Sequence, residues 1–139
     1  MNTVRWEHFE HKADIGIRGF GATQAQAFEQ AALAMTSVIC NTALIQPISS
    51  ITISCRENNN DTLLYEWLNT LIYEMATRKM LFGQFEVSID RGHLTATATG
   101  ETIDVQRHQP AVEIKGATYT ELAVYQRECN WVAQCVVDV

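Results

Sequence analysis

The segment between Asp61 and Lys79 constrains the fold most, because it carries a long and regular apolar stripe. Apolar side chains recur there at the i, i+3, i+4 and i+7 spacing of one helix face, at Leu63, Leu64, Trp67, Leu68, Leu71, Ile72 and Met75. Asp61 is a suitable N-cap residue, and Arg78 and Lys79 suit the C-terminal end of a helix dipole. The sequence therefore predicts a helix whose apolar face must be buried against another layer.

A second helix is predicted from about residue 24 to residue 40. Thr23 and Gln26 have the spacing of a capping box. One face then gathers Phe28, Ala31, Ala32, Met35, Val38 and Ile39. The alanines on this face would let the helix lie close against a sheet.

The rest of the chain alternates with the period of β-strands. The predicted strands cover residues 4–10, 15–19, 51–55, 85–89, 94–98, 112–117, 122–124 and 131–137. Asp90-Arg91-Gly92 predicts a hairpin turn, and residues 126–130 predict another. Residues 100–110 are polar without periodicity and predict a loop. The fold class that follows is α+β, with two helices packed on a mostly antiparallel sheet and room for two strand–helix–strand–strand units. A chain of 139 residues is expected to form one domain, residues 1–139.

Composition excludes several function classes. The net charge is −6 and no run of Lys or Arg is present, so direct nucleic-acid binding is not expected. The first residues lack the apolar run of a signal peptide, and no apolar stretch reaches the ~20 residues that span a bilayer. The 4 cysteines match no C-x-x-C pattern. We therefore expect a cytoplasmic protein with reduced thiols and no membrane association.

Two aspartates lie near opposite ends of the sequence. Asp14 follows the first predicted strand, and Asp138 is followed at once by Val139 with its α-carboxylate. If the two ends meet in space, these carboxylates repel one another unless a cation lies between them. Such oxygen ligands suit Ca²⁺, Mg²⁺ or Mn²⁺. The alternative is that Asp14 caps a turn and Asp138 is a solvated residue.

Several stretches together resemble the archease family. His11-Lys12-Ala13-Asp14-Ile15-Gly16 is similar to the family's H-T-A-D-x-G signature, and residues 63–69, LLYEWLN, are similar to its L-L-x-x-W-L-N helix. Gly100-Glu101 followed by His108, then residues 113–119, EIKGATY, resemble its G-E…H…x-I-K-A-V-T-Y segment. Residues 131–139 resemble its closing strand with a terminal Asp. The resemblance runs the whole length of the chain in the same order.

The resemblance implies an accessory protein without catalytic activity of its own. Archeases activate the 3′-phosphate RNA ligase of tRNA splicing and RNA repair, by promoting guanylylation of the ligase and its multiple turnover. The resemblance also implies a divalent cation, most often Ca²⁺, held by Asp14, Asp138 and Val139. It suggests a role for Lys115 at the partner or nucleotide surface. His108 and Glu101 are further candidates for that surface, and ordinary solvent exposure is the alternative for both.

Two positions depart from the family pattern. Lys12 replaces the usual Thr and puts a positive charge beside Asp14, and Thr120 stands where a His commonly follows T-Y. Two other function classes stay open. One is a small metal-dependent hydrolase that uses Asp14, Asp138 and His11. The other is a general chaperone or adaptor for RNA-modifying enzymes.

Overall fold

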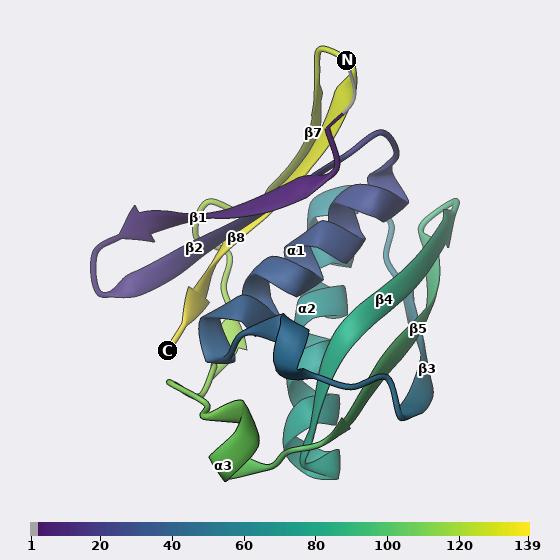
Figure 1. Cartoon of the computed structure of the whole chain (residues 1–139). Coiled ribbons are helices and arrows are strands. Elements are labelled where there is room, and N and C mark those ends of the chain that lie inside the picture. The colour runs from purple at the N-terminus through teal and green to yellow at the C-terminus, as the bar shows by residue number, and fades with distance from the viewer. Residues whose placement is uncertain (1–2) are drawn as a thin grey trace.

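The computed structural model describes residues 3–139 and shows two antiparallel sheets with the two long helices between them (Figure 1). The elements, in chain order, are β1 (Arg5–His11), β2 (Asp14–Gly21), α1 (Gln24–Ile39), η1 (Thr42–Leu44), β3 (Ser49–Arg56), α2 (Asn60–Arg78), β4 (Met80–Asp90), β5 (His93–Thr102), α3 (Val105–His108), β6 (Gly116–Ala117), β7 (Ala123–Arg127) and β8 (Asn130–Asp138). The predicted α+β class is confirmed, with the strands divided between two sheets. The unit β3–α2–β4–β5 is one of the expected strand–helix–strand–strand units, whereas the first half begins with two strands before its helix.

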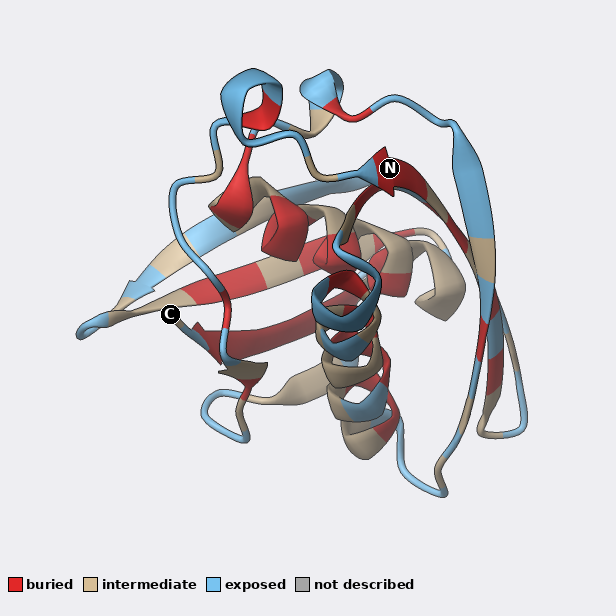
Figure 2. Cartoon of the chain, turned by 90° about the horizontal axis from the view of Figure 1, so that it is seen from below, coloured by how far each residue is buried: buried red, intermediate tan, exposed pale blue. Residues whose placement is uncertain are grey.

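The first sheet has the order β1-β2-β8-β6, and β7 also pairs with β8. Its pairs are antiparallel, and β2 meets β8 in a register that runs from Gly21–Trp131 to Ile15–Val137. Strand β8 is almost wholly buried because it has neighbours on both sides, while β1 is largely exposed at the edge (Figure 2). This topology places β2, which begins at Asp14, beside the C-terminal strand β8, with β1 on the other side of β2.

The second sheet has the order β3-β5-β4. The hairpin between β4 and β5 turns at Arg91 and Gly92, both with positive φ, as the Asp-Arg-Gly sequence predicts. The predicted hairpin of β7 and β8 is confirmed too, with Arg127 opposite Asn130.

Helix α1 packs very closely on β2, as its alanines predict. Ala27, Ala31 and Ala34 are fully buried. A Cβ added at Gly19 would lie 2.3 Å from the Ala31 nitrogen and 2.4 Å from the Ala27 oxygen, so only glycine fits at this crossing. The predicted N-cap is confirmed, because the Thr23 side chain accepts a hydrogen bond from the Gln26 amide at 3.1 Å.

Helix α2 begins at Asn60, two residues earlier than an N-cap at Asp61 would give. The N-cap is Asn59, whose side chain accepts from the amides of Asp61 and Thr62, so the assignment of Asp61 as N-cap was wrong. Asp61 instead accepts a hydrogen bond from the Val124 amide at 2.7 Å and ties the helix to β7. Trp67 is fully buried and its indole N–H donates to the Phe28 carbonyl on α1, which joins the two helices.

The predicted loop over residues 100–110 and the predicted strand over residues 112–117 both need correction. Strand β5 continues to Thr102, and a helical turn, α3, follows it. Of residues 112–117, only Gly116 and Ala117 form a strand, β6. The preceding residues cross between elements instead of joining the sheet, and the Ala111 amide donates to the Ile39 carbonyl at 2.7 Å.

Among residues 3–139, no helix is both long and apolar enough to cross a bilayer. Cys135 is buried and Cys55 is half-buried, in keeping with their predicted role as small apolar residues. Burial raises the pKa of the Cys135 thiol to about 12.

Candidate functional site

The residues of the predicted site gather at one end of the first sheet. His11 faces Asp14 across the β1–β2 turn, and Gly116 faces Asp138 across β6 and β8. Between them, Ile15 pairs with Val137, so Asp14 and Asp138 are the next position on each of two antiparallel strands. Facing positions of an antiparallel pair project from the same side of a sheet. A row of side chains from distant parts of the sequence therefore crosses this end, close to the C-terminus in Figure 1.

The electrostatics of this row fit a cation. Within residues 3–139, neither the Asp14 nor the Asp138 carboxylate has a hydrogen bond or an ion pair. Val139, whose α-carboxylate adds a third negative group, packs its side chain against the core next to Asp138. Hard oxygen donors without a protein counter-charge are the set that Ca²⁺ or Mg²⁺ takes. Asp14, Asp138 and Val139 are thus the residues that would hold it.

The described residues contain no group of three or more His, Cys, Asp or Glu side chains arranged to hold a metal ion. The set Asp14, Asp138 and Val139 differs from such a group because one of its donors is a main-chain carboxylate. The hydrolase alternative needs His11 together with both aspartates, and these residues do not form such a group.

Lys115 lies immediately beside the row. Its amide donates to the Asp138 carbonyl at 2.7 Å, one residue before β6 begins. Its side chain is exposed and makes no ion pair with Glu113 or Glu101, the two partners considered from the sequence. The structure therefore brings Lys115 to Asp138 through the main chain and leaves the ammonium group available.

Glu101 and His108 do not face solvent, and their predicted exposure was wrong. His108 is 1% exposed and Glu101 8% exposed. The Asp104 amide donates to His108 Nδ1 at 2.9 Å, so Nε2 carries the proton and donates to Glu101 Oε2 at 2.9 Å. Glu101 also accepts from the Arg107 guanidinium at 2.7 Å and from the Gln46 amide at 2.8 Å.

This network explains why a glutamate can be buried there. Hydrogen bonds from Arg107, then from the Gln46 amide, hold the pKa of Glu101 at about 2. The carboxylate stays ionised and ties α3 and the η1 region to β5. His108 and Glu101 are therefore not brought to the sheet-end row, and their contacts are those of a structural network.

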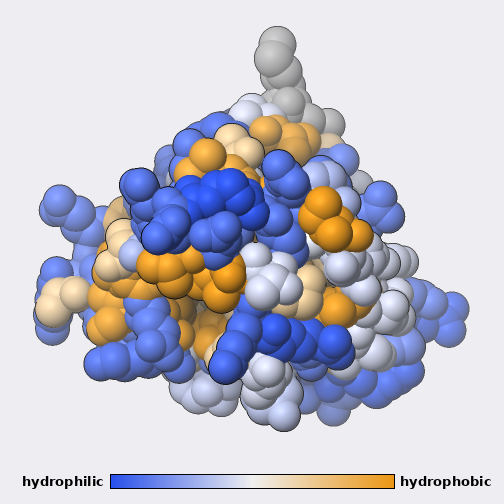
Figure 3. Space-filling view, turned by 60° about the horizontal axis from the view of Figure 1, so that its bottom comes forward, coloured by the Kyte–Doolittle hydropathy of each residue, from blue (hydrophilic) through white to orange (hydrophobic). Residues whose placement is uncertain are grey.

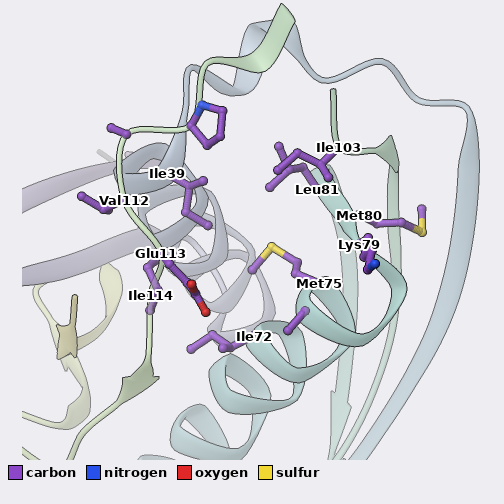
Figure 4. Close-up of a pocket in the computed structure, with 13 residues that line it drawn as sticks. Ile39, Ile72, Met75, Lys79, Met80, Leu81, Ile103, Val112, Glu113 and Ile114 are labelled. Atoms are coloured by element: carbon purple, nitrogen blue, oxygen red, sulfur yellow. The ribbon is translucent and has the colours of Figure 1, made fainter. Parts of the chain in front are cut away.

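A separate groove of about 490 Å³ opens between the C-terminal part of α2 and residues 110–114. Apolar patches interrupt the polar surface on the side of the molecule at the bottom of Figure 1 (Figure 3). The groove is lined mainly by apolar side chains such as Ile72, Met75 and Ile114, and Glu113 reaches across it toward α2 (Figure 4). Its wall of residues 110–114 leads directly to Lys115.

Asn69 is a residue of the site region that sequence reasoning missed. Its side chain accepts from the Ala117 amide at 3.0 Å and donates to the Ala117 carbonyl at 3.3 Å. The signal was present in the LLYEWLN stretch, because a half-buried Asn amid the apolar stripe needs hydrogen-bond partners. Which main chain it would meet could not be read from the local sequence.

Known proteins of one family are similar to this chain over almost its whole length. The model of the archease protein family matches residues 6–139. The protein archease of Pyrococcus furiosus is 38% identical over 140 residues, covering 97% of this chain and 99% of its own length. That of Sulfolobus acidocaldarius is 34% identical, covering 98% and 99%.

Solved structures give the same fold. The solution structure of Methanobacterium thermoautotrophicum protein 1598 superposes with a TM-score of 0.86 at 31% identity, covering 96% of this chain and 98% of that one. A Thermotoga maritima crystal structure described as an archease and possible chaperone has a TM-score of 0.65 at 16% identity, with both chains fully covered, and supports the fold alone. By its full-length match to the family model and to these relatives, the chain belongs to the archease family.

Proposed function

We propose that this protein is a divalent-cation-binding activator of a 3′-phosphate RNA ligase in tRNA splicing or RNA repair. It promotes guanylylation of the ligase and its multiple turnover, and it has no ligase or nuclease activity of its own. The family membership supports this role. The observation that carries it is the row of unneutralised Asp14 and Asp138 on neighbouring strands, with Lys115 hydrogen-bonded to Asp138 through its amide.

The net charge of the protein favours binding to a protein partner over direct binding to RNA. The net charge is −6 and the sequence contains no run of Lys or Arg, which does not favour binding to a phosphate backbone. A bound Ca²⁺ would add a local charge of +2 beside the Lys115 ammonium, so this sheet end would become a small positive site on an acidic protein. Such a site suits phosphate or carboxylate groups in the cleft of a partner enzyme.

The residues at this end of the sheet have different proposed roles. Asp14, Asp138 and the Val139 α-carboxylate would hold the cation, which would supply positive charge at the ends of the two strands. Lys115, held at that end by its main chain, offers a flexible ammonium to phosphate oxygens. A tag added after Val139 would convert its α-carboxylate to an amide and should weaken cation binding.

The test is RNA ligation by a purified 3′-phosphate RNA ligase, with and without this protein, at substrate in large excess over ligase. We expect the protein to increase both the guanylylated fraction of ligase and the number of turnovers. The protein incubated alone with RNA and Ca²⁺, Mg²⁺ or Mn²⁺ should leave the RNA intact. Metal-dependent cleavage by the protein alone would favour the hydrolase, and unchanged turnover of the ligase would contradict the proposal.

A further inference from the structure

The segment from Gln109 to Gly116 carries Lys115 but has little regular structure to hold it. Strand β6 is only two residues long, and it pairs with β8 along one edge. Its other edge would be left without main-chain partners in a part of the molecule packed on α2. The Lys115 and Thr118 amides bond β8, but a strand this short needs a contact on its other edge as well to hold Lys115 firmly in place.

Asn69 of α2 supplies the missing partners. Its side-chain amide presents an acceptor and a donor, which bond the Ala117 amide at 3.0 Å and the Ala117 carbonyl at 3.3 Å. These are the two groups that a neighbouring strand would have satisfied. The contact joins residues 48 apart in sequence. β6 is therefore held between β8 and a helix side chain.

We propose that Asn69 is a positioning residue for Lys115, a role that rests on the proposed activator function. By fixing Ala117, it fixes the main chain two residues before it, where the Lys115 amide meets the Asp138 carbonyl. Asn69 thereby holds Lys115 next to the candidate cation site. The side chain acts on activation through the position of Lys115 and does not itself touch the partner.

Helix α2 provides a matched control. Asp61, two turns before Asn69, accepts from the Val124 amide at 2.7 Å and fastens β7 in the same manner. Asp61→Ala and Asn69→Ala each remove a fastening between α2 and the first sheet, but only the second leads to Lys115. Asn69→Asp keeps the acceptor for the Ala117 amide and loses the donor to its carbonyl.

The experiment is a double-mutant cycle read by multiple-turnover ligation, together with amide hydrogen exchange and thermal melting of each variant. Asn69→Ala should lower the stimulation of the ligase about tenfold or more, since a misplacement of about 1 Å can cost a factor of ~100. It should lower stimulation little further in a Lys115→Ala background, because both changes act through the same residue. Asp61→Ala should leave stimulation near that of the unchanged protein, and Asn69→Asp should fall between the two.

Hydrogen exchange separates this proposal from the proposed function. The Ala117 amide should exchange faster in Asn69→Ala and the Val124 amide faster in Asp61→Ala. Unchanged Ala117 protection, full stimulation by a folded Asn69→Ala variant, or equal losses with and without Lys115 would each overturn the positioning role. If the unchanged protein does not stimulate the ligase, the proposed function is wrong. The positioning of Lys115 for activation is then wrong too, even if the Ala117 amide still exchanges faster in Asn69→Ala.

Discussion

At the scale of single residues, the acidic side chains fall into two groups that the structure distinguishes by their partners. Glu101 and Glu7 are neutralised by arginines, Arg107 and Arg18 respectively, and the resulting hydrogen bonds lower the pKa of each glutamate. Asp14 and Asp138 lie on neighbouring strands and have no such partner within residues 3–139. The first group stabilises the fold, and the second is the pair to which we assign the proposed cation site.

The first prediction concerns cation-dependent stability. Asp14→Asn and Asp138→Asn should fold normally, because neither carboxylate bonds to the rest of the described protein. Ca²⁺ at about 100 times its dissociation constant should stabilise the unchanged protein by about 2.7 kcal/mol, and the variants should lose most of this. Thermal melting with and without Ca²⁺ measures it, with Asp90→Asn, an exposed acid at a distant hairpin, as the control. Equal Ca²⁺ stabilisation in all three variants would show that the cation binds elsewhere.

The second prediction concerns acid stability. The folded-state pKa of Glu101 is about 2 against an ordinary 4.5, so its ionised form favours the folded state. This contribution is complete above pH 4.5 and is lost as the pH falls toward about 2. Glu101→Gln should therefore be less stable at neutral pH and should lose less stability over that range. Urea unfolding at several pH values measures the slope, and an identical slope in both proteins would contradict the assignment.

At the scale of elements, the two long helices were predictable because their sequence signals are local. The hydrogen bonds that join them to the sheets were not predictable, because they involve residues far away in the sequence. The apolar period located α1 and α2 to within a few residues. Asn59 and Asp61 are both good N-cap residues. The Asp61 side chain does not cap the helix because it accepts a hydrogen bond from the Val124 amide, 63 residues away. Helical turn α3 was missed because the contacts of Asp104 and buried His108 hold it instead of an apolar period.

The third prediction tests the close crossing of α1 over β2. Gly19→Ala should destabilise the protein by about 1–3 kcal/mol, because the new methyl group meets helix main chain that cannot move aside. Gly116→Ala is the control, since its Cβ would lie 3.5 Å from the nearest neighbour, an ordinary contact with Asn69 Oδ1. Chemical denaturation of both variants measures the free energy of unfolding. A Gly19→Ala variant as stable as Gly116→Ala would show that α1 does not pack so closely on β2.

At the scale of the whole molecule, the sheet order β1-β2-β8-β6 brings positions 11, 14, 115 and 138, far apart in sequence, to one end of the sheet. The end-to-end pairing of Asp14 and Asp138 was a hypothesis from the sequence, and the family resemblance supplied their expected role. Strand order and register could not be derived from periodicity, because alternating strands of similar character can pair in many orders. For the same reason, the sequence could not predict the contact between Asn69 and Ala117 or the burial of Glu101 and His108.

The central claim is that activation of the ligase depends on a cation at Asp14 and Asp138 and on Lys115 beside it. The most direct measurement is the number of RNA ligation turnovers as a function of Ca²⁺, for the unchanged protein, Asp138→Asn and Lys115→Ala. Turnover should rise with Ca²⁺ occupancy for the unchanged protein and stay near the ligase-alone level for Asp138→Asn. Lys115→Ala should bind Ca²⁺ normally, as its melting shift will show, and yet stimulate poorly. Full, Ca²⁺-independent stimulation by Asp138→Asn, from a variant that melts as a folded protein, would contradict the account.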